Sequence, residues 1–493
     1  MKTIHEQINK TSRPVRILQY GEGVFLRAFA EYMVDIANEK GILNSGIQVV
    51  KRSPSARLDA LRAQNCMYTV LLRGKRKGET YCEKRIITCL DNVVSTESEY
   101  EAYAAFARRS ELRFILSNTT EAGIAYDEKD SLALCPPVSF PGKLTKLLYE
   151  RFLYFNGSPD KGLIILPVEL IDRNGDTLRA CCLQLTDRWE LSPAFRDWLD
   201  NCNIFCNTLV DRIVTGYPAN AGEAEAIERE LGYRDKCLVL GEPFALWVIE
   251  SRDLHTVAAE FPLDKAGLPV VFTDNLHPYR DRKVRLLNGG HTVCAPVAYL
   301  AGLDTVGDIM QDTVLRAFLE RAVQDELAPT LSSPADEVKK FTQAVIERFE
   351  NPFLRHNLLS ISLNAVSKFR VRVLPAILET QEATGNLPEL LCFSLAALIA
   401  FFCGKPDRDG RMQGQRGSET YELLDAPSVL SFFAERGESS AYELVDSFLK
   451  RVDFWERDLS LIPGLTETAS GYLERIRSAG MRASVETLLA APV

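Results

Sequence analysis

Short apolar runs alternate with helix-like spacing over the first half of the chain. The runs are continuous rather than alternating, which is typical of strands buried on both faces of a parallel sheet. They are Val15–Gln19, Ile47–Val50, Thr69–Leu72, Arg85–Leu90, Arg113–Ser117 and Leu163–Val168. Between the first two, Phe25, Phe29, Met33 and Ile36 recur at helical spacing, and Gly41 suits the end of that helix. We therefore predict an α/β fold that begins with a βαβ unit.

The pattern changes after a further predicted strand at Val270–Thr273. Helical spacing dominates from about Lys283 to the end, interrupted by prolines. The apolar stretch Leu390–Cys403 predicts a buried helix, and the polar residues 404–418 predict an exposed loop between helices. We expect a Rossmann-like domain over residues 1–276 with a mainly parallel sheet, and a mostly α-helical domain over 277–493.

Length and composition fit this organisation. A chain of 493 residues is too long for one ordinary core. The formal net charge of −9 argues against nucleic acid or an anionic membrane as a partner. No run of 18 apolar residues occurs, so no membrane span is expected. The twelve cysteines form no CxxC pair, which indicates free thiols in the cytoplasm and no metal site.

A glycine turn follows the first predicted strand. Gly21, Glu22 and Gly23 precede Val24 and Phe25, which open the first helix. Two glycines let a backbone approach a pyrophosphate, and a helix N-terminus supplies amide donors. The third glycine of the usual fingerprint is absent, with Leu26 in its place. The alternative interpretation is a simple tight turn.

The second strand ends in Lys51-Arg52, where an NAD-preferring enzyme usually carries an acid for the ribose hydroxyls. Two cations would accept a 2′-phosphate as well, so the residues alone do not choose between NAD and NADP. Asn118, Thr119, Thr120 and Glu121 follow another strand at the same predicted sheet edge. They are candidates for cofactor contact, although such residues also cap helices.

The richest constellation of polar residues is Lys283, Asn288 and His291. In an α-helix, at roughly 100° per residue, the three side chains fan over about 140° of one face. A lysine can donate a proton, and an amide and an imidazole can stabilise a developing oxyanion. That equipment suits reduction of a ketone to an alcohol, or the reverse. A basic surface segment is the alternative interpretation.

Three further groups remain open between function and structure. Lys368 and Arg372 are four residues apart, so they share a helix face and could clamp a carboxylate. His356 lies nearby in sequence and is expected to be structural. Asp211-Arg212, within residues 207–213, predicts a structural ion pair.

Taken in order, these motifs resemble the mannitol dehydrogenase family of polyol-specific long-chain dehydrogenases. The resemblance covers nearly the whole chain. Its longest segments are SNTTEAGIAY, FNGSPDKGLIILPVELIDRNGD, TLVDRIVTGYP and HNLLSISLNAVSKFR. It implies reversible, NAD-linked interconversion of a keto sugar acid and its alcohol, with no catalytic metal. A nucleotide-sensing binding protein is the alternative class, and the oligomeric state stays open, a monomer included.

The resemblance also implies roles for residues. Lys283, Asn288 and His291 fall on the family's catalytic lysine, asparagine and histidine. The family's cofactor turn matches Gly21, Glu22, Gly23, Val24, Phe25 and Arg27, and the cofactor set extends to Arg52, Asn118, Thr119, Thr120 and Glu121. Glu169, Lys368 and Arg372 are candidates for substrate binding. Glu169-Leu170 stand where mannitol dehydrogenases carry Asp-Asn, so an oxyanion-binding asparagine is absent and a mannitol or fructose substrate is disfavoured.

Overall fold

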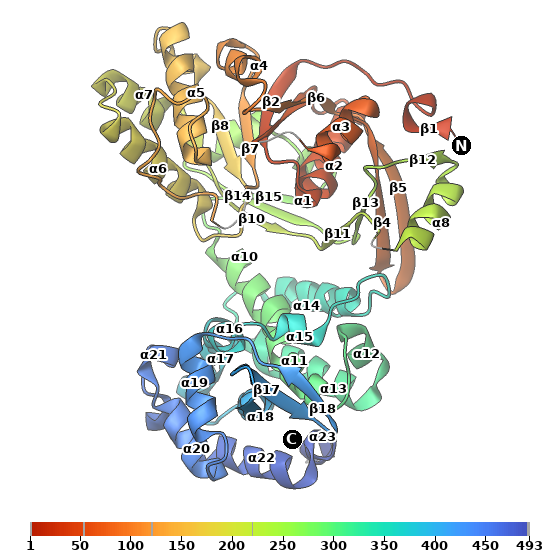
Figure 1. Ribbon diagram of the computed structural model, residues 1–493, viewed down its shortest axis with the longest axis vertical. Coiled ribbons are helices and arrows are strands. Elements are labelled where there is room, and N and C mark those ends of the chain that lie inside the picture. Colours follow the sequence, from red (N-terminus) through yellow and green to blue (C-terminus); the bar gives the residue numbers. More distant parts are fainter. Residues whose placement is uncertain (1, 53–54, 120–121, 219, 491–493) are drawn as a thin grey trace. The chain divides into compact units, whose positions relative to one another are not determined.

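The computed structural model describes residues 2–52, 55–119, 122–218 and 220–490. The chain divides into two compact units, Met1–His277 and Pro278–Val493, coloured red to green and green to blue in Figure 1. The first unit combines helices with sheets, and the second is mostly helical. The predicted fold class is confirmed, and the division falls next to the predicted boundary at residue 276.

The first unit is built on a six-stranded sheet in the order β6-β3-β2-β7-β8-β9. All its strands run parallel. They are β2 (Val15–Tyr20), β3 (Gly46–Lys51), β6 (Leu90–Ser95), β7 (Phe114–Ser117), β8 (Ile164–Pro167) and β9 (Ile204–Phe205). The central strands are buried throughout, which is why their sequences read as continuous apolar runs.

Alternate residues of this sheet enter two separate cores. Ile17 belongs to one buried cluster and Leu18 to the other, as the twofold period of a strand requires. The first cluster takes in the helical segment that follows β2, and the second takes in α5 (Phe140–Tyr154) and α6 (Asn174–Arg188). The sheet is therefore covered on both faces, and its carboxyl edge is left for ligands.

Two of the predicted strand runs belong elsewhere. Thr69–Leu72 lies in β4 (Tyr68–Arg76), which pairs antiparallel with β5 (Glu79–Ile87). The four-stranded sheet they belong to is completed by β13 (Val239–Gly241) and β11 (Val214–Gly216). The run 85–90 is divided between β5 and the first residue of β6. An apolar run shows that a strand is buried but not which strand it pairs with, so this hairpin was wrongly placed in the parallel sheet. A third sheet joins β10 (Asn207–Asp211), β14 (Leu246–Glu250) and β15 (Val270–Thr273).

The second unit packs around α18 (Glu389–Phe402), the predicted buried helix. Its one hydroxyl, Ser394, donates to the Val293 carbonyl in α11 (Gly289–Leu300) at 2.8 Å, so the polar group is satisfied inside an apolar core. The predicted loop 404–418 is wrong in part. It forms an antiparallel meander of β16 (Gly404–Pro406) and β17 (Met412–Arg416), completed by β18 (Glu419–Glu422).

Candidate active site

The turn after β2 is shaped for close approach of a ligand. Gly21 has φ +112°, and a Cβ on it would lie 2.7 Å from the backbone oxygen of Asn118, so only glycine fits. The Gly21 amide donates to the Val50 carbonyl at 2.9 Å, which ties the turn to the end of β3. Gly23 is the N-cap of α1 (Val24–Leu26). The bare backbone at this helix N-terminus fits the pyrophosphate of a dinucleotide.

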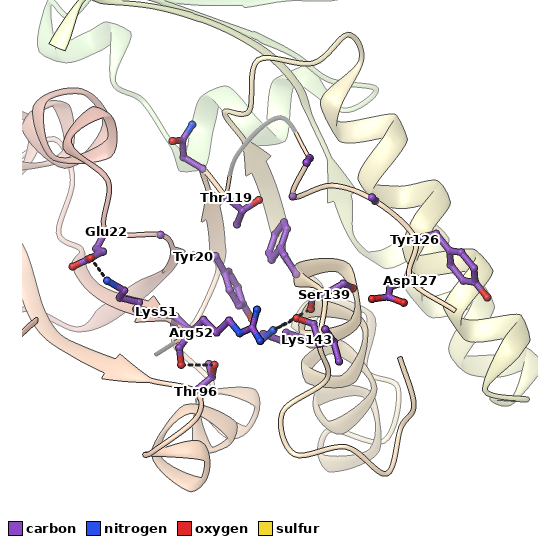
Figure 2. Close-up of a pocket in the computed structure, with 18 residues that line it drawn as sticks. Tyr20, Glu22, Lys51, Arg52, Thr96, Thr119, Tyr126, Asp127, Ser139 and Lys143 are labelled. Atoms are coloured by element: carbon purple, nitrogen blue, oxygen red, sulfur yellow. Dashed lines mark hydrogen bonds and ion pairs between the residues drawn. The ribbon is translucent and has the colours of Figure 1, made fainter. Parts of the chain in front are cut away.

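A pocket of about 520 Å³ opens beside this turn (Figure 2). Its lining comes from the carboxyl ends of β2 and β3 and from the segments after β6 and β7. Among the predicted cofactor residues it includes Gly21, Glu22, Arg52, Asn118 and Thr119. Lys51, discussed with Arg52 from sequence, also lines it, whereas Thr96, Tyr126, Asp127, Ser139 and Lys143, labelled in Figure 2, were missed. Thr120 and Glu121 lie outside the described residues.

The two cations at the end of β3 are not equivalent. Lys51 forms an ion pair with the buried Glu22 of the glycine turn, and its ammonium also donates to Ser55 Oγ at 2.9 Å. Arg52 is exposed and pairs with Glu97 at 3.0 Å. Both cations thus have an acidic partner and both line the pocket, but only Lys51 is paired within the glycine turn.

Lys143 adds a cation that the sequence did not indicate. It lies in the first turn of α5, and its ammonium donates to the Val138 carbonyl at 2.6 Å. Burial, opposed by the charge of Asp130 and reinforced by that of Arg52, lowers the pKa of Lys143 to about 8. The spacing of Lys143 four residues after the N-cap Ser139 was the available signal.

Glu169 is buried at the ends of β7 and β8. Its carboxylate accepts from Ser117 Oγ and from both the amide and the hydroxyl of Thr119, each at 3.0 Å. Burial raises the pKa of Glu169, and these bonds oppose the rise. The contacts give the carboxylate a structural role in holding the Asn118-Thr119 segment, while substrate contact stays a prediction. Leu170 beside it is 61% exposed.

Three residues of the predicted cofactor turn face away from the pocket. Arg27 is 2% exposed, donates to the Cys237 carbonyl at 2.7 Å and lies over the Tyr68 ring. Phe25 stacks on Phe29, and Val24 packs against Gly216. The first helix turns the Arg27 side chain into the core, and a role of this residue in cofactor binding stays a prediction.

The catalytic candidates of the second unit lie on one continuous helical segment. It runs through α10 (His277–Arg282), a π-helical turn over Lys283–Asn288, and α11. The prediction assumed regular α geometry. A π turn bonds residues five apart rather than four, so Lys283 and Asn288 come closer to the same side than in an α-helix. Such turns occur often at functional sites.

Two glycines bring other helices against this segment. A Cβ on Gly289 would lie 3.3 Å from the backbone oxygen of Arg372, at the end of α16 (Ala365–Arg372). A Cβ on Gly290 would lie 3.1 Å from a methyl of Val323 and 3.4 Å from the Phe349 ring. In Asn288-Gly289-Gly290-His291 the two outer residues are therefore candidates for chemistry, and the two glycines between them allow other helices to pack closely.

His291 is half-buried, and its Nε2 atom is buried without a hydrogen-bond partner in the described residues. Its ring centroid lies 4.5 Å from that of Phe349 and 5.4 Å from that of His356. Burial lowers the pKa of His291 well below its usual range, and His356, Arg348, Arg372 and Lys368 lower it further. The ring is therefore neutral at pH 7 and can donate a hydrogen bond from one nitrogen.

The predicted carboxylate clamp lies close to this histidine. Arg372 donates to Thr292 Oγ1 on α11 at 3.3 Å. Lys368, on the same face of α16, donates to the Ile361 carbonyl at 3.0 Å. Burial lowers the pKa values of both side chains, and for Lys368 the neighbouring charge of Arg372 adds to this. Arg348, in α14 (Ala335–Phe349), is 6% exposed and was missed by sequence analysis.

The arginines that flank Lys283 are paired with acids. Arg282 binds Glu337 at 2.6 Å, and Arg285 binds Glu379 through two nitrogens at 2.7 and 3.0 Å. Each of these two positive charges is therefore compensated by a carboxylate.

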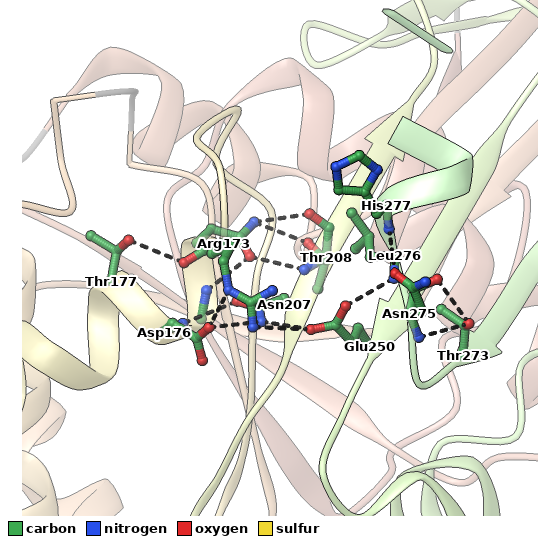
Figure 3. A network of polar contacts seen from close by, with 12 residues as sticks. Arg173, Asp176, Thr177, Asn207, Thr208, Glu250, Thr273, Asn275, Leu276 and His277 are labelled. Atoms are coloured by element: carbon green, nitrogen blue, oxygen red, sulfur yellow. Dashed lines mark hydrogen bonds and ion pairs between the residues drawn. The ribbon is translucent and has the colours of Figure 1, made fainter. Parts of the chain in front are cut away.

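A network of polar contacts joins the end of β8 to β10 and β14 (Figure 3). Asn174, fully buried, bridges the Pro167 carbonyl at 3.1 Å and the Thr208 amide at 2.9 Å. Asn207 binds Glu250 at 3.0 Å, and the other oxygen of Glu250 accepts from the Leu276 amide at 2.8 Å. The motifs at residues 169–176 and 207–211 thus hold the end of β8 against β10, and they connect β10 and β14 to the last residues of the first unit.

Arg212 does not act through the predicted ion pair with its neighbour. Its guanidinium donates to the carbonyls of Ala28, Phe244 and Pro243, at 2.5, 3.0 and 3.3 Å, and lies over the Tyr32 ring. The prediction rested on adjacency in sequence. Successive side chains in an extended segment point to opposite sides, so neighbours seldom pair.

Within the described residues, no cluster of three His, Cys, Asp or Glu side chains is arranged to hold a metal ion. None of the helices in the described part of the chain is both long and apolar enough to cross a bilayer.

Comparison with known proteins gives consistent results over the whole chain. Residues 15–264 match the mannitol dehydrogenase Rossmann domain, and residues 275–477 match the mannitol dehydrogenase C-terminal domain. Altronate oxidoreductases of Shigella flexneri and Escherichia coli K12 are each 44% identical, over 99% of this chain and 100% of theirs.

Two solved structures show the same fold at low identity. Mannitol 2-dehydrogenase of Pseudomonas fluorescens, in a ternary complex with NAD and D-mannitol, is 21% identical with a TM-score of 0.69, over 98% of this chain and 95% of that one. A substrate-free D-sorbitol dehydrogenase is 20% identical with a TM-score of 0.79, over 98% and 100%. The chain belongs to the mannitol dehydrogenase family.

Proposed function

We propose that the protein is an NAD-dependent oxidoreductase that reversibly reduces D-tagaturonate to D-altronate. The full-length similarity to altronate oxidoreductases supports the substrate. The observation that carries the chemistry is the neutral, half-buried His291 on the same helical segment as Lys283 and Asn288, beside Lys368 and Arg372. The second unit thereby holds a candidate proton donor and candidate oxyanion donors for a ketone, together with a candidate site for the substrate's carboxylate.

The chain's own residues divide the work. Lys283 gives a proton to the keto oxygen, and Asn288 and His291 donate hydrogen bonds to that oxygen as negative charge develops on it. Loss of one such donor costs about 10²–10³ in rate in comparable sites. Bound NADH supplies the hydride to the keto carbon. In the reverse direction Lys283, in its neutral form, accepts the proton of the alcohol.

Binding of the substrate carboxylate is assigned to Lys368 and Arg372. An arginine offers two parallel donors to a carboxylate, and a lysine adds a point charge. Both side chains are partly buried, so a charge-assisted bond there is stronger than on an open surface. For a protein with a net charge of −9, such a local positive site is needed to hold an anion.

Binding of the dinucleotide is assigned to the glycine turn and the pocket beside it. The amides at the start of the first helix would hold the pyrophosphate, and Asn118, Thr119 and Arg52 would contact the rest. Arg52 does not exclude a 2′-phosphate, so NAD preference rests on family membership and on the NAD-bound relative. A cytoplasmic location is part of the proposal, and it is supported by the twelve free cysteines.

The test is NADH oxidation at 340 nm with D-tagaturonate, beside D-fructuronate, D-fructose and an NADPH arm. We expect turnover on tagaturonate and a fall of about 10²–10⁴ in kcat for Lys283→Ala. Lys340→Ala, at an exposed lysine of α14, is the matched control and should retain full activity.

Other outcomes identify the rivals. Preference for D-fructuronate, which gives D-mannonate, would keep the mechanism and change the substrate. Preference for a neutral ketose would make the protein another polyol dehydrogenase. NADH binding without turnover on any of them would favour a nucleotide-sensing binding protein.

A further inference from the structure

His356 adjoins the candidate catalytic histidine from a different segment. It lies between α14 and α15 (Leu358–Ile361), where sequence analysis expected a structural role. Its carbonyl accepts from the Val306 amide at 3.0 Å, and the Leu358 amide donates to the Asp304 carbonyl at 2.9 Å. Backbone contacts on either side therefore fix this residue, and the imidazole is not needed to hold its own segment.

The two imidazoles form an edge-to-face pair. The ring centroids of His291 and His356 are 5.4 Å apart, with an interplanar angle of 66°. Within the described residues, the Nε2 atom of His291 is fully buried and has no hydrogen-bond partner. Buried polar atoms are nearly always satisfied, so an open ring nitrogen beside a second imidazole indicates a ligand.

The charges around the pair are positive. Burial lowers the pKa values of both histidines, and the positive charge of Arg348 lowers both further. Lys368 and Arg372 act on His291 in the same direction. Asp425 acts on Lys368, but its carboxylate is bound to backbone amides, that of Val366 among them. Two neutral rings inside a positive field suit a polar ligand that brings a negative charge.

We propose that His356 is a further substrate-binding residue that, beside His291, hydrogen-bonds the sugar acid and adapts the site to a substrate carrying a carboxylate. This inference rests on the proposed function. An uncharged imidazole gives a donor or an acceptor without neutralising Arg348, Lys368 and Arg372. An acid at this position would pair with those cations and would repel the substrate.

The experiment compares His356→Asn and His356→Asp with wild type, on D-tagaturonate and on D-tagatose, its neutral counterpart. For His356→Asn we expect the KM for tagaturonate to rise about tenfold with little change in kcat, because one neutral hydrogen bond is lost. For His356→Asp we expect a rise of a hundredfold or more, while the KM for NADH is unchanged. On tagatose the two variants should differ by less than threefold.

Asn357→Asp is the matched control, since it adds the same charge at the exposed next residue, and it should behave as wild type. Equal losses on tagaturonate and tagatose, or a wild-type KM in His356→Asn, would overturn the proposal. Thermal unfolding of each variant identifies a folding defect, and His356→Asn decides the question if the aspartate variant does not fold. Absence of tagaturonate turnover in wild type would instead overturn the proposed function.

Discussion

The side chains around His291 combine a neutral imidazole with several cations, an arrangement that suits binding of an anionic substrate. Burial and the nearby cations lower the pKa of this imidazole and keep it neutral. A neutral histidine donates one hydrogen bond without competing for the substrate's proton. Lys283, the candidate proton donor, lies on the wide turn that precedes the histidine.

The neutral state of His291 has a consequence for stability. Its pKa is lowered in the folded protein, so below about pH 6.5 the unfolded chain binds a proton that the folded chain does not. Stability from this group falls as the pH drops below 6.5 and goes on falling until the folded pKa is passed. The slope is at most about 1.4 kcal/mol per pH unit for one group.

We therefore expect His291→Gln to gain stability relative to wild type as the pH is lowered from 7.5 to 5.5, in urea unfolding. His255→Gln, at an exposed histidine, should track wild type across the range. A constant difference between wild type and His291→Gln at all pH values would contradict the prediction.

A second prediction at this scale concerns Gly21. In Gly21→Ala the new methyl would meet the Asn118 carbonyl at 2.7 Å, and the positive φ adds a strain of about 1–2 kcal/mol. The turn must shift, so we expect the dissociation constant for NADH to rise at least tenfold, measured by fluorescence titration. Gly78→Ala has the same kind of φ with open space around it, and should cost stability but leave NADH binding intact.

Elements were predictable from the sequence where one pattern decided them. The buried parallel strands and the buried helix α18 are apolar along nearly their whole length, so their sequences alone predict them. The hairpin of β4 and β5 was misplaced because strand pairing is non-local, and the small sheet at β16–β18 was missed because its strands are short and polar. Lys143 carries only the weak local signal of its spacing from an N-cap serine, and Arg348 carries none, since tertiary packing brings it beside His356.

The packing of α11 against α16 gives a prediction at the scale of elements. A methyl at Gly289→Ala would lie 3.3 Å from the Arg372 carbonyl and would push α16 outward. We expect the KM for the sugar acid to rise at least fivefold, because Lys368 and Arg372 move, and stability to fall by about 1–3 kcal/mol through overpacking.

Gly471→Ala is the control for that experiment. It lies inside α22 (Leu465–Ala479) with open space around the new methyl, so it should be neutral or stabilising. A Gly289→Ala enzyme with unchanged KM and higher stability would show that the contact has no functional weight.

At the scale of the whole molecule, chemistry is divided between the two units. The glycine turn, the pocket beside it and both cores of the parallel sheet lie in Met1–His277. Lys283, Asn288 and His291 all lie in Pro278–Val493. The candidate nucleotide site and the candidate proton-transfer residues therefore belong to different compact units of the chain.

We expect a chain ending at residue 277 to fold cooperatively and to bind NADH within tenfold of the full-length affinity, with no ketone reduction. Circular dichroism and fluorescence titration would measure both properties. The same truncated chain carrying Gly21→Ala should lose the binding, which would exclude a nonspecific signal. A truncated chain that folds but does not bind NADH would contradict the assignment of the glycine turn.

The wide turn at Lys283–Asn288 also bears on how this site can change. A π turn holds one residue more than an α-helix needs over the same length. Deleting one residue there would restore regular α-helical spacing, and the helix on either side would keep nearly its present phase. Lys283 would therefore still face the side of the histidine. The wide turn thus lets this segment lose one residue without changing which side chains share a face, whereas the same deletion in a regular helix would rotate all that follows by roughly 100°.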